Sequence, residues 1–302
     1  MIGVRGGQLA SSESPASEAV PSALRHLTEA TVLAALGSAR TGQVVSLNSR
    51  LDGPTPTTRP RLRRHLRLHN VIRQIPDGRY VVLNDDIIEV ATQGSSQWDT
   101  FAHCGAIEPG VDGIFLGGLG LDETAGDGMP QHLGLSALGP GVVTRGVLLD
   151  TVAVLRPDDG FLADDDRVDR AVVEACLKRQ GAELRPGDAV FIYTGFGRRY
   201  SHTDEKLPQR AGGIDFSTMP LWADAKVSAL ISDNMAVESS PADFRVHITA
   251  LRDLGIPLGE LWALEELAGL LRSQERHDFL LASVPLNLPY AFGSPANAVA
   301  VL

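Results

Sequence analysis

Two features of the sequence predict an α/β fold. In the second half of the chain, apolar strand patterns alternate with helical ones, an order typical of α/β proteins. Several predicted strands also end in a polar side chain, at Asp150, Thr194 and Asp233, and open α/β folds place their sites at such strand ends. Composition marks no domain boundary. We therefore expect a flexible N-terminal arm over residues 1–20 and a single α/β domain over residues 21–302.

The first half of the chain predicts few regular elements. Residue spacing predicts a helix over residues 22–36 and strands over residues 44–47, 79–83 and 86–91. Gly37 stops the helix, and Asn84 and Asp85 are expected to separate the last two strands. The Gly-rich stretch 110–141 has no period, so a lid over the site and a disordered loop both remain open interpretations.

The second half contains the elements on which the fold class rests. Apolar runs predict strands within residues 141–155, 189–194, 227–232, 279–286 and 297–302. Amphipathic spacing and stop signals predict helices over residues 167–184, 221–225, 241–254 and 261–272.

Composition restricts the class of function. The 302 residues include 27 basic and 37 acidic side chains, a net charge of −10, which disfavours a nucleic-acid partner. No apolar run is long enough to span a bilayer, and no signal peptide is recognisable. We expect a cytoplasmic protein that acts on a small-molecule substrate, with neither nucleic acid nor membrane as a partner. Two cysteines provide no disulfide framework.

One basic patch stands out in this acidic chain. It comprises Arg59, Arg61, Arg63, Arg64, His65 and Arg67. The patch could receive an anionic substrate or the acidic face of another subunit, but a solvated segment is the interpretation we favour.

Chemistry is expected in residues 93–105, which follow an alternating apolar run. This segment places Asp99 and His103 close together, with Gln93, Gln97 and Trp98 beside them. A carboxylate and an imidazole on one short segment can share a metal or act as an acid–base pair. A polar turn with a loop-capping histidine is the alternative.

Familiar cofactor and nucleophile motifs do not occur in the sequence. It has no phosphate-binding loop, no Gly-x-Ser-x-Gly elbow and no Cys-x-x-Cys zinc pattern. His247 and Glu260 remain as candidate site residues, because the turn between them can bring their side chains together. With Asp99 they would form a set that suits Mn²⁺ or Mg²⁺ at least as well as Zn²⁺. The alternative interpretations are that His247 is an ordinary core or surface histidine of a helix and that Glu260 caps the start of the next helix.

Several motifs, in order along the chain, resemble the cyclase-like metal hydrolase family, which includes bacterial kynurenine formamidase and isatin hydrolase. The matching pieces are residues 97–103 (Gln-Trp-Asp-Thr-Phe-Ala-His), 144–150, 187–195, 232–241, 247 with 255–260, and 292–295. The Gln-Trp-Asp form is similar to a longer branch of that family. The resemblance implies a swivelling β/β/α fold, usually assembled as homodimers or homotetramers.

The resemblance also implies roles for individual residues. The family's acid–base histidine falls on His103, and its later metal ligands fall on Asp99, His247 and Glu260. Its two N-terminal metal histidines fall on glutamines, Gln93 and Gln97. A two-metal site is therefore not expected. One divalent ion (Mn or Zn) on the three ligands, and a metal-free site, both remain open.

Further polar and aromatic residues are expected around the substrate. The predicted substrate-binding side chains are Gln93, Gln97, Trp98, Phe101 and Arg145. For Arg145, an ion pair with Asp150 is the alternative. Asp233 and Glu238 lie where family members place residues beside the site, although strand-end capping explains them as well.

Three hypotheses for function follow. The first is a metal-dependent hydrolase of a cyclic amide, formamide or lactone, in which His103 moves protons. The second is a ring-forming or dehydrating cyclase of natural-product biosynthesis that works without hydrolysis. The third is a binding protein that kept the fold and lost the chemistry.

Overall fold

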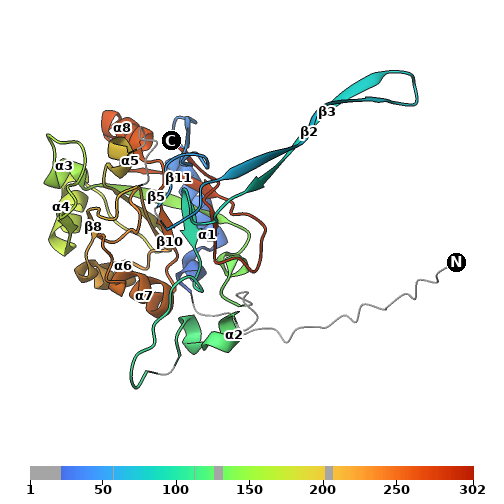
Figure 1. The fold of residues 1–302 in the computed structure, drawn as a ribbon. Helices are drawn as coiled ribbons and strands as arrows, with labels where there is room; N and C mark the ends of the chain where they lie inside the picture. The colour runs from blue at the N-terminus through green and yellow to red at the C-terminus, as the bar shows by residue number, and fades with distance from the viewer. Residues whose placement is uncertain (1–21, 57, 112, 126–131, 201–206) are drawn as a thin grey trace.

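The computed structural model describes residues 22–56, 58–111, 113–125, 132–200 and 207–302. The expected N-terminal arm lies outside these residues. Within them, a nine-stranded sheet with helices packed around it forms the body of the molecule, and a two-stranded ribbon projects from it (Figure 1). The α/β class predicted from the sequence is confirmed.

Four parallel strands form the centre of the sheet, and antiparallel strands flank them on both sides. The order across the sheet is β1-β13-β11-β5-β7-β9-β10-β4-β12, and β5, β7, β9 and β10 are the parallel set. The strands are β1 Val44–Ser46, β4 Gln97–Asp99, β5 Val142–Asp150, β7 Ala189–Tyr193, β9 Ala229–Ser232, β10 Leu258–Glu260, β11 Asp278–Ser283, β12 Gly293–Pro295 and β13 Ala298–Val301.

Two small sheets complete the described strands. β2 (Arg63–Gln74) and β3 (Tyr80–Glu89) pair with each other to form the ribbon. β6 (Arg167–Val168) and β8 (Gly213–Ile214) form a short parallel pair.

The helices are mostly short. They are α1 Glu29–Ala35, α2 Leu121–Ala125, α3 Val152–Leu155, α4 Arg170–Gln180, α5 Phe196–Tyr200, α6 Met219–Ala225, α7 Arg245–Ile248 and α8 Glu265–Ser273. The longest, α4, has both of its ends capped: the Asp169 side chain accepts from the Val172 amide, and Gly181 takes the left-handed conformation that ends a helix. No helix in these described ranges is both long and apolar enough to cross a membrane.

Aromatic side chains occupy the core between the central strands and the site segment. Trp98 packs edge-on against Trp262 at 5.0 Å between ring centroids, and Phe191 contacts both Trp262 (5.6 Å) and Phe279 (5.0 Å). All four rings are almost completely buried. Edge-to-face packing of this kind adds to the free energy gained by burying the rings.

The predicted strands of the second half are present, whereas several boundaries differ. The helix expected over 261–272 begins only at Glu265, so Glu260 belongs to a strand and caps no helix. The helix expected over 241–254 begins at Arg245 and continues as a π-helical turn, Thr249–Leu254. The helix expected over 22–36 is broken, and only Glu29–Ala35 is α-helical.

One expectation for the first half was wrong. Residues 79–83 and 86–91 are not consecutive strands, because β3 runs through Asn84 and Asp85 without a turn. For the Gly-rich stretch 110–141, which could be a lid or a disordered loop, Leu133 is buried and its carbonyl accepts from the Ala102 amide at 3.1 Å, so this part of the stretch packs on the site segment.

The expected ion pair between Arg145 and Asp150 does not form. The two residues lie five apart on β5, and a strand rises about 3.3 Å per residue, so their side chains are too far apart. Arg145 instead pairs with Asp188 through two hydrogen bonds of 2.9 and 2.6 Å, and Asp150 pairs with Arg272. Arg145 thus lies at the end of the sheet where the parallel strands begin, away from the site described below.

We expect the buried Arg145–Asp188 pair to be sensitive to loss of one partner. Asp188→Ala should lower the free energy of unfolding by about 3–5 kcal/mol, because it leaves a buried guanidinium without its carboxylate. Asp86→Ala, which removes the exposed partner of Arg64, is the matched control and should cost no more than about 1 kcal/mol. Urea denaturation measures both. Equal effects would contradict the assignment of Arg145 to a structural pair.

Candidate metal and acid–base site

The antiparallel pairing of β4 with β10 builds the floor of the site. In this register Gln97 lies opposite Glu260, and Asp99 lies opposite Leu258. Directly paired residues project to the same face of a sheet, and neighbours along a strand project to opposite faces. Gln97, Asp99 and Glu260 therefore share one face, and the Gln97 amide donates to Glu260 at 2.8 Å.

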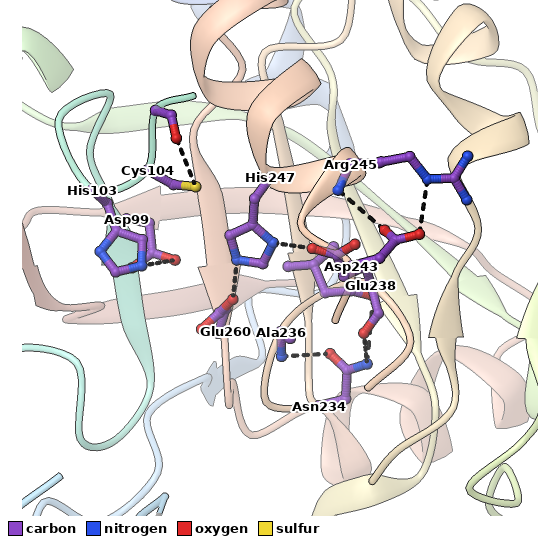
Figure 2. Close-up of polar contacts among 12 residues, drawn as sticks. Asp99, His103, Cys104, Asn234, Ala236, Glu238, Asp243, Arg245, His247 and Glu260 are labelled. Carbon is purple, nitrogen blue, oxygen red and sulfur yellow. Dashed lines mark hydrogen bonds and ion pairs between the residues drawn. The ribbon is translucent and has the colours of Figure 1, made fainter. Parts of the chain in front are cut away.

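His247 reaches the same face from α7. Its Nδ1 hydrogen-bonds the Glu238 carboxylate, and its Nε2 lies 3.2 Å from Glu260 Oε1. Figure 2 shows the ring held between these two carboxylates, with Asp99 and His103 on the far side of Glu260. The Phe244 ring packs edge-on against it at 5.6 Å. The orientation of His247 is therefore fixed on three sides.

The three predicted ligands converge. One ligand atom each from Asp99, His247 and Glu260 lies within 4.8 Å of the other two, and all three residues are buried. Asp99 Oδ2 and Gln97 Oε1 are buried without a hydrogen-bond partner among the described residues. The carboxylates of Asp99 and Glu260, the imidazole of His247 and the amide oxygen of Gln97 fit one divalent cation. Glu238 on the other ring nitrogen is the outer carboxylate that commonly supports a metal-binding histidine.

The site is short of positive charge. Burial and the nearby Asp99 raise the pKa of Glu260 to about 7. Burial alone would lower the pKa of His247, but the hydrogen bonds and charges of Glu238 and Glu260 outweigh it and raise that pKa well above its ordinary value. Three buried carboxylates thus surround one imidazole, an arrangement that favours binding of a cation.

Gln93 holds His103 in one orientation. Its amide nitrogen donates to Asp99 Oδ1 at 2.7 Å and lies 2.6 Å from His103 Nδ1, and Arg59 donates to its amide oxygen at 3.3 Å. An ionised Asp99 only accepts and Arg59 only donates, so the Gln93 nitrogen must face His103. His103 Nδ1 is then the acceptor, and the neutral ring carries its proton on Nε2.

His103 is the accessible member of the group. Its side chain is 22% exposed, whereas that of Asp99 is fully buried, and its Nε2 lies 4.0 Å from Asp99 Oδ2. The His103 and His247 rings are 6.4 Å apart between centroids. The N–H of the neutral ring therefore lies on the side of Asp99 Oδ2, the oxygen that lacks a hydrogen-bond partner among the described residues, and it can donate a hydrogen bond to a substrate atom bound there.

The structure brings six of the predicted residues together and places three elsewhere. Those at the site are Gln93, Gln97, Asp99, His103, His247 and Glu260. Trp98 projects from the other face of β4 and donates to Ser283, and Phe101 is buried in the core, so both pack the interior. Arg145 lies on the central strand β5, at the end where the parallel strands begin, which is opposite to the site. The contact of Arg59 with Gln93 was not predicted, because it joins residues that no local pattern connects.

The comparisons with known proteins agree with this geometry. Residues 45–239 match a family model described as a putative cyclase. The chain belongs to the putative cyclase family. The resemblance seen in the motifs is confirmed, and the chain is an enzyme of this family.

Solved structures extend the match along the chain. A crystal structure of a novel cyclase is 28% identical, with a TM-score of 0.82 over 93% of this chain and 94% of that one. Isatin hydrolase A from Ralstonia solanacearum is 16% identical, with a TM-score of 0.60 over 90% and 97%. A predicted metal-dependent hydrolase from Bacillus stearothermophilus is 12% identical, with a TM-score of 0.53 over 85% and 97%. Because the isatin hydrolase and the predicted metal-dependent hydrolase are so low in sequence identity, their similarity shows only that the fold is shared. No curated protein matched the chain.

A second polar group of this cyclase-family enzyme forms where the parallel strands end. Asp233 Oδ1, just after β9, accepts from the backbone amide and the hydroxyl of Thr194, at 2.8 and 2.7 Å. Thr194 and Asp233, two of the three polar residues predicted at strand ends, are therefore in contact. Asp233 lies in the wall of a 420 Å³ cavity that Phe196 and Trp262 also line. Burial raises its pKa to about 6, against an ordinary value of 3.8.

We expect Asp233 to make stability fall as the pH rises from about 4 to about 6. In this window the folded state keeps a proton that the unfolded state releases, so raising the pH favours unfolding, by about 1–3 kcal/mol in total. Asp233→Asn should remove this contribution, since the amide does not titrate. Urea midpoints at pH 4.5 and 7 measure it, with the exposed Asp86→Asn as the control. An unchanged pH dependence in Asp233→Asn would show that this carboxyl does not carry the effect.

Proposed function

We propose that this enzyme hydrolyses a cyclic amide, a formamide or a lactone at the site formed by Asp99, His103, His247 and Glu260. The observation that carries the proposal is the buried Oδ2 of Asp99, which lacks a partner among the described residues and lies beside two further ligand groups. The accessible imidazole of His103 lies next to it. The similar fold of isatin hydrolase A and of a predicted metal-dependent hydrolase supports the reaction class.

In the proposed reaction Asp99, His247 and Glu260 would hold one divalent ion, with Gln97 Oε1 as an additional oxygen. Such an ion, Mn²⁺ or Zn²⁺, would polarise the carbonyl and make water more acidic. Glu238 keeps His247 in its binding orientation.

His103 is the proposed hydrogen-bond donor to the reacting oxygen. Gln93 occupies Nδ1, so the neutral ring presents Nε2–H, which can donate to a substrate oxygen as negative charge develops on it. Proton transfer by His103 would require the Gln93 amide to turn over, because a ring that accepts a proton at Nε2, and a protonated ring that can give one away, both carry a hydrogen on Nδ1. Asp99 and Arg59 oppose that change. The geometry therefore favours a hydrogen-bonding role over the acid–base role that the resemblance to the family implies.

A second candidate is cyclisation or dehydration without hydrolysis. The observation that favours it is that Gln93 and Gln97 donate amide hydrogens to Asp99 and Glu260, which partly satisfies these carboxylates without a cation. His103 and Asp99 would then exchange protons with the substrate directly. The mass of the product separates the two reactions, because hydrolysis adds one water and cyclisation does not.

Metal content tests the proposed ligand set. The purified enzyme should contain about one divalent ion per chain, and Glu260→Gln should weaken its binding at least tenfold, because an amide replaces a charged ligand. Gln97→His should strengthen binding, because imidazole is a better ligand than an amide. Glu266→Gln, on an exposed position of α8, is the control. Elemental analysis and metal titration measure these effects, and full turnover after exhaustive chelation would rule out the metal-dependent reaction.

The role of His103 is tested by turnover of a panel of cyclic amides, formamides and lactones. His103→Ala should lower kcat by about 10²–10³-fold while leaving metal content unchanged, because a hydrogen-bond donor to the reacting oxygen is lost and no metal ligand is. Gln93→Leu should give a smaller loss and a shifted pH profile, because the ring is no longer held in one tautomer. His65→Ala, exposed on β2, is the control. Unchanged turnover in His103→Ala would rule out a role of this side chain in the reaction.

A further inference from the structure

The 420 Å³ cavity beside Asp233 is separate from the candidate metal site. It lies at the carboxyl ends of two central strands, because Asp233 directly follows β9 and Phe196 comes shortly after β7. Its walls, so far as described residues form them, include none of the site residues Asp99, His103, His247 and Glu260. Open α/β folds bind ligands at this end of the sheet, and cavities of about 300–1,000 Å³ are typical of small-molecule sites.

Asp233 brings an oxygen without a partner to the wall of this cavity. The residue is only 2% exposed, and its Oδ1 accepts both hydrogen bonds from Thr194. Its Oδ2 is buried and makes no hydrogen bond to any described residue. Buried carboxylate oxygens are nearly always hydrogen-bonded. A donor that occupies the cavity would therefore complete this group.

The charges in the cavity favour a cation. Three acidic side chains, Asp52, Asp233 and Glu265, line it together with one basic side chain, Arg50. Two hydrogen bonds of 2.8 Å pair Arg50 with Asp52, so Asp233 and Glu265 are left in excess. Arg198 lies 3.9 Å from Glu265 but does not line the cavity. Burial raises the pKa of Asp233 to about 6, which leaves this carboxyl mostly ionised at neutral pH.

Aromatic rings supply an apolar wall. The cavity is lined by Phe196 and Tyr200, whose ring centroids are 4.7 Å apart, and by the buried Trp262. The Trp262 indole N–H already donates to the backbone carbonyl of Gln97 at 2.8 Å, so this ring has no hydrogen left for a ligand. Aromatic faces attract ammonium groups and pack against apolar ones.

We propose that this cavity is a second ligand site, which binds a small primary amine in its ammonium form. The ammonium group donates to Asp233 Oδ2, and Glu265 adds negative charge nearby. The apolar or aromatic body of the amine packs on Phe196, Tyr200 and Trp262. An anionic ligand would instead meet two carboxylates, with the one lining arginine already paired.

Calorimetric titration of the full chain with 2-phenylethylamine tests the proposal. This probe combines an ammonium group with one aromatic ring, and one molecule should bind per chain. The neutral counterpart 2-phenylethanol should bind at least about tenfold more weakly, because it lacks the charge that Asp233 would pair with. Absence of amine binding at millimolar concentration would show that water alone completes Oδ2 and would overturn the proposal, as would equal binding of the alcohol.

Substitution of Asp233 locates the ammonium group. In Asp233→Asn the amide oxygen must keep the place of Oδ1, because the Thr194 backbone N–H can only donate, so the NH₂ group replaces Oδ2. Amine affinity should fall at least about tenfold, because two donors then face each other. Glu265→Gln, on a half-exposed side chain, should lower the affinity less and guards against misfolding of the first variant.

Two further variants separate this cavity from other acidic groups. Glu266→Gln, next to Glu265 on α8 but outside the cavity, is the matched control and should bind the amine like the wild type. Glu260→Gln, at the metal site, should also bind it unchanged. Amine binding that is lost in Glu260→Gln, or retained in full by both Asp233→Asn and Glu265→Gln, would place the amine elsewhere and overturn the assignment.

Discussion

The site depends on three carboxylates that are buried around a single imidazole. Asp99 and Glu260 come from paired strands and Glu238 comes from the loop before α7, so the fold itself forces the like charges together. Burial of such a group is costly unless opposite charge or hydrogen-bond donors accompany it. The chain supplies one histidine and two glutamine amides, which leaves Asp99 Oδ2 without a partner among the described residues. A bound cation is the simplest way to complete this set.

The two glutamines change what the neighbouring residues can do. Where the resemblance to the family implies metal-binding imidazoles, Gln97 donates to Glu260 and Gln93 joins Asp99 to His103. An amide that donates to a carboxylate oxygen competes with a metal for that oxygen. The Gln93 amide also fixes the proton of His103 on Nε2. In the proposed reaction the exchange of histidine for glutamine would therefore weaken metal binding and keep His103 as a hydrogen-bond donor, two effects with one cause.

The sequence predicted three of the four central strands and six site residues, and its errors have physical reasons. It did not predict β10 as a strand, because a three-residue strand leaves too short a pattern. Strands such as β7 and β9 are buried on both faces, so their apolar runs are unambiguous. Motif order located Asp99, His247 and Glu260 but not the faces of β4, and alternation sends Trp98 into the core. Asn84 and Asp85 look like a turn, yet a ribbon that is exposed on both faces tolerates polar residues in mid-strand. Contacts between distant segments, such as Arg59 with Gln93, leave no local pattern.

The contact of Arg59 with Gln93 also links the ribbon to the site. Arg59 lies four residues before β2 and Gln93 four residues after β3, so their hydrogen bond closes the root of the ribbon. The same Gln93 orients His103 and donates to Asp99. Because both strands of the ribbon end beside this hydrogen bond, a movement of the ribbon at its root would displace Gln93. His103 would then lose the contact that fixes its tautomer.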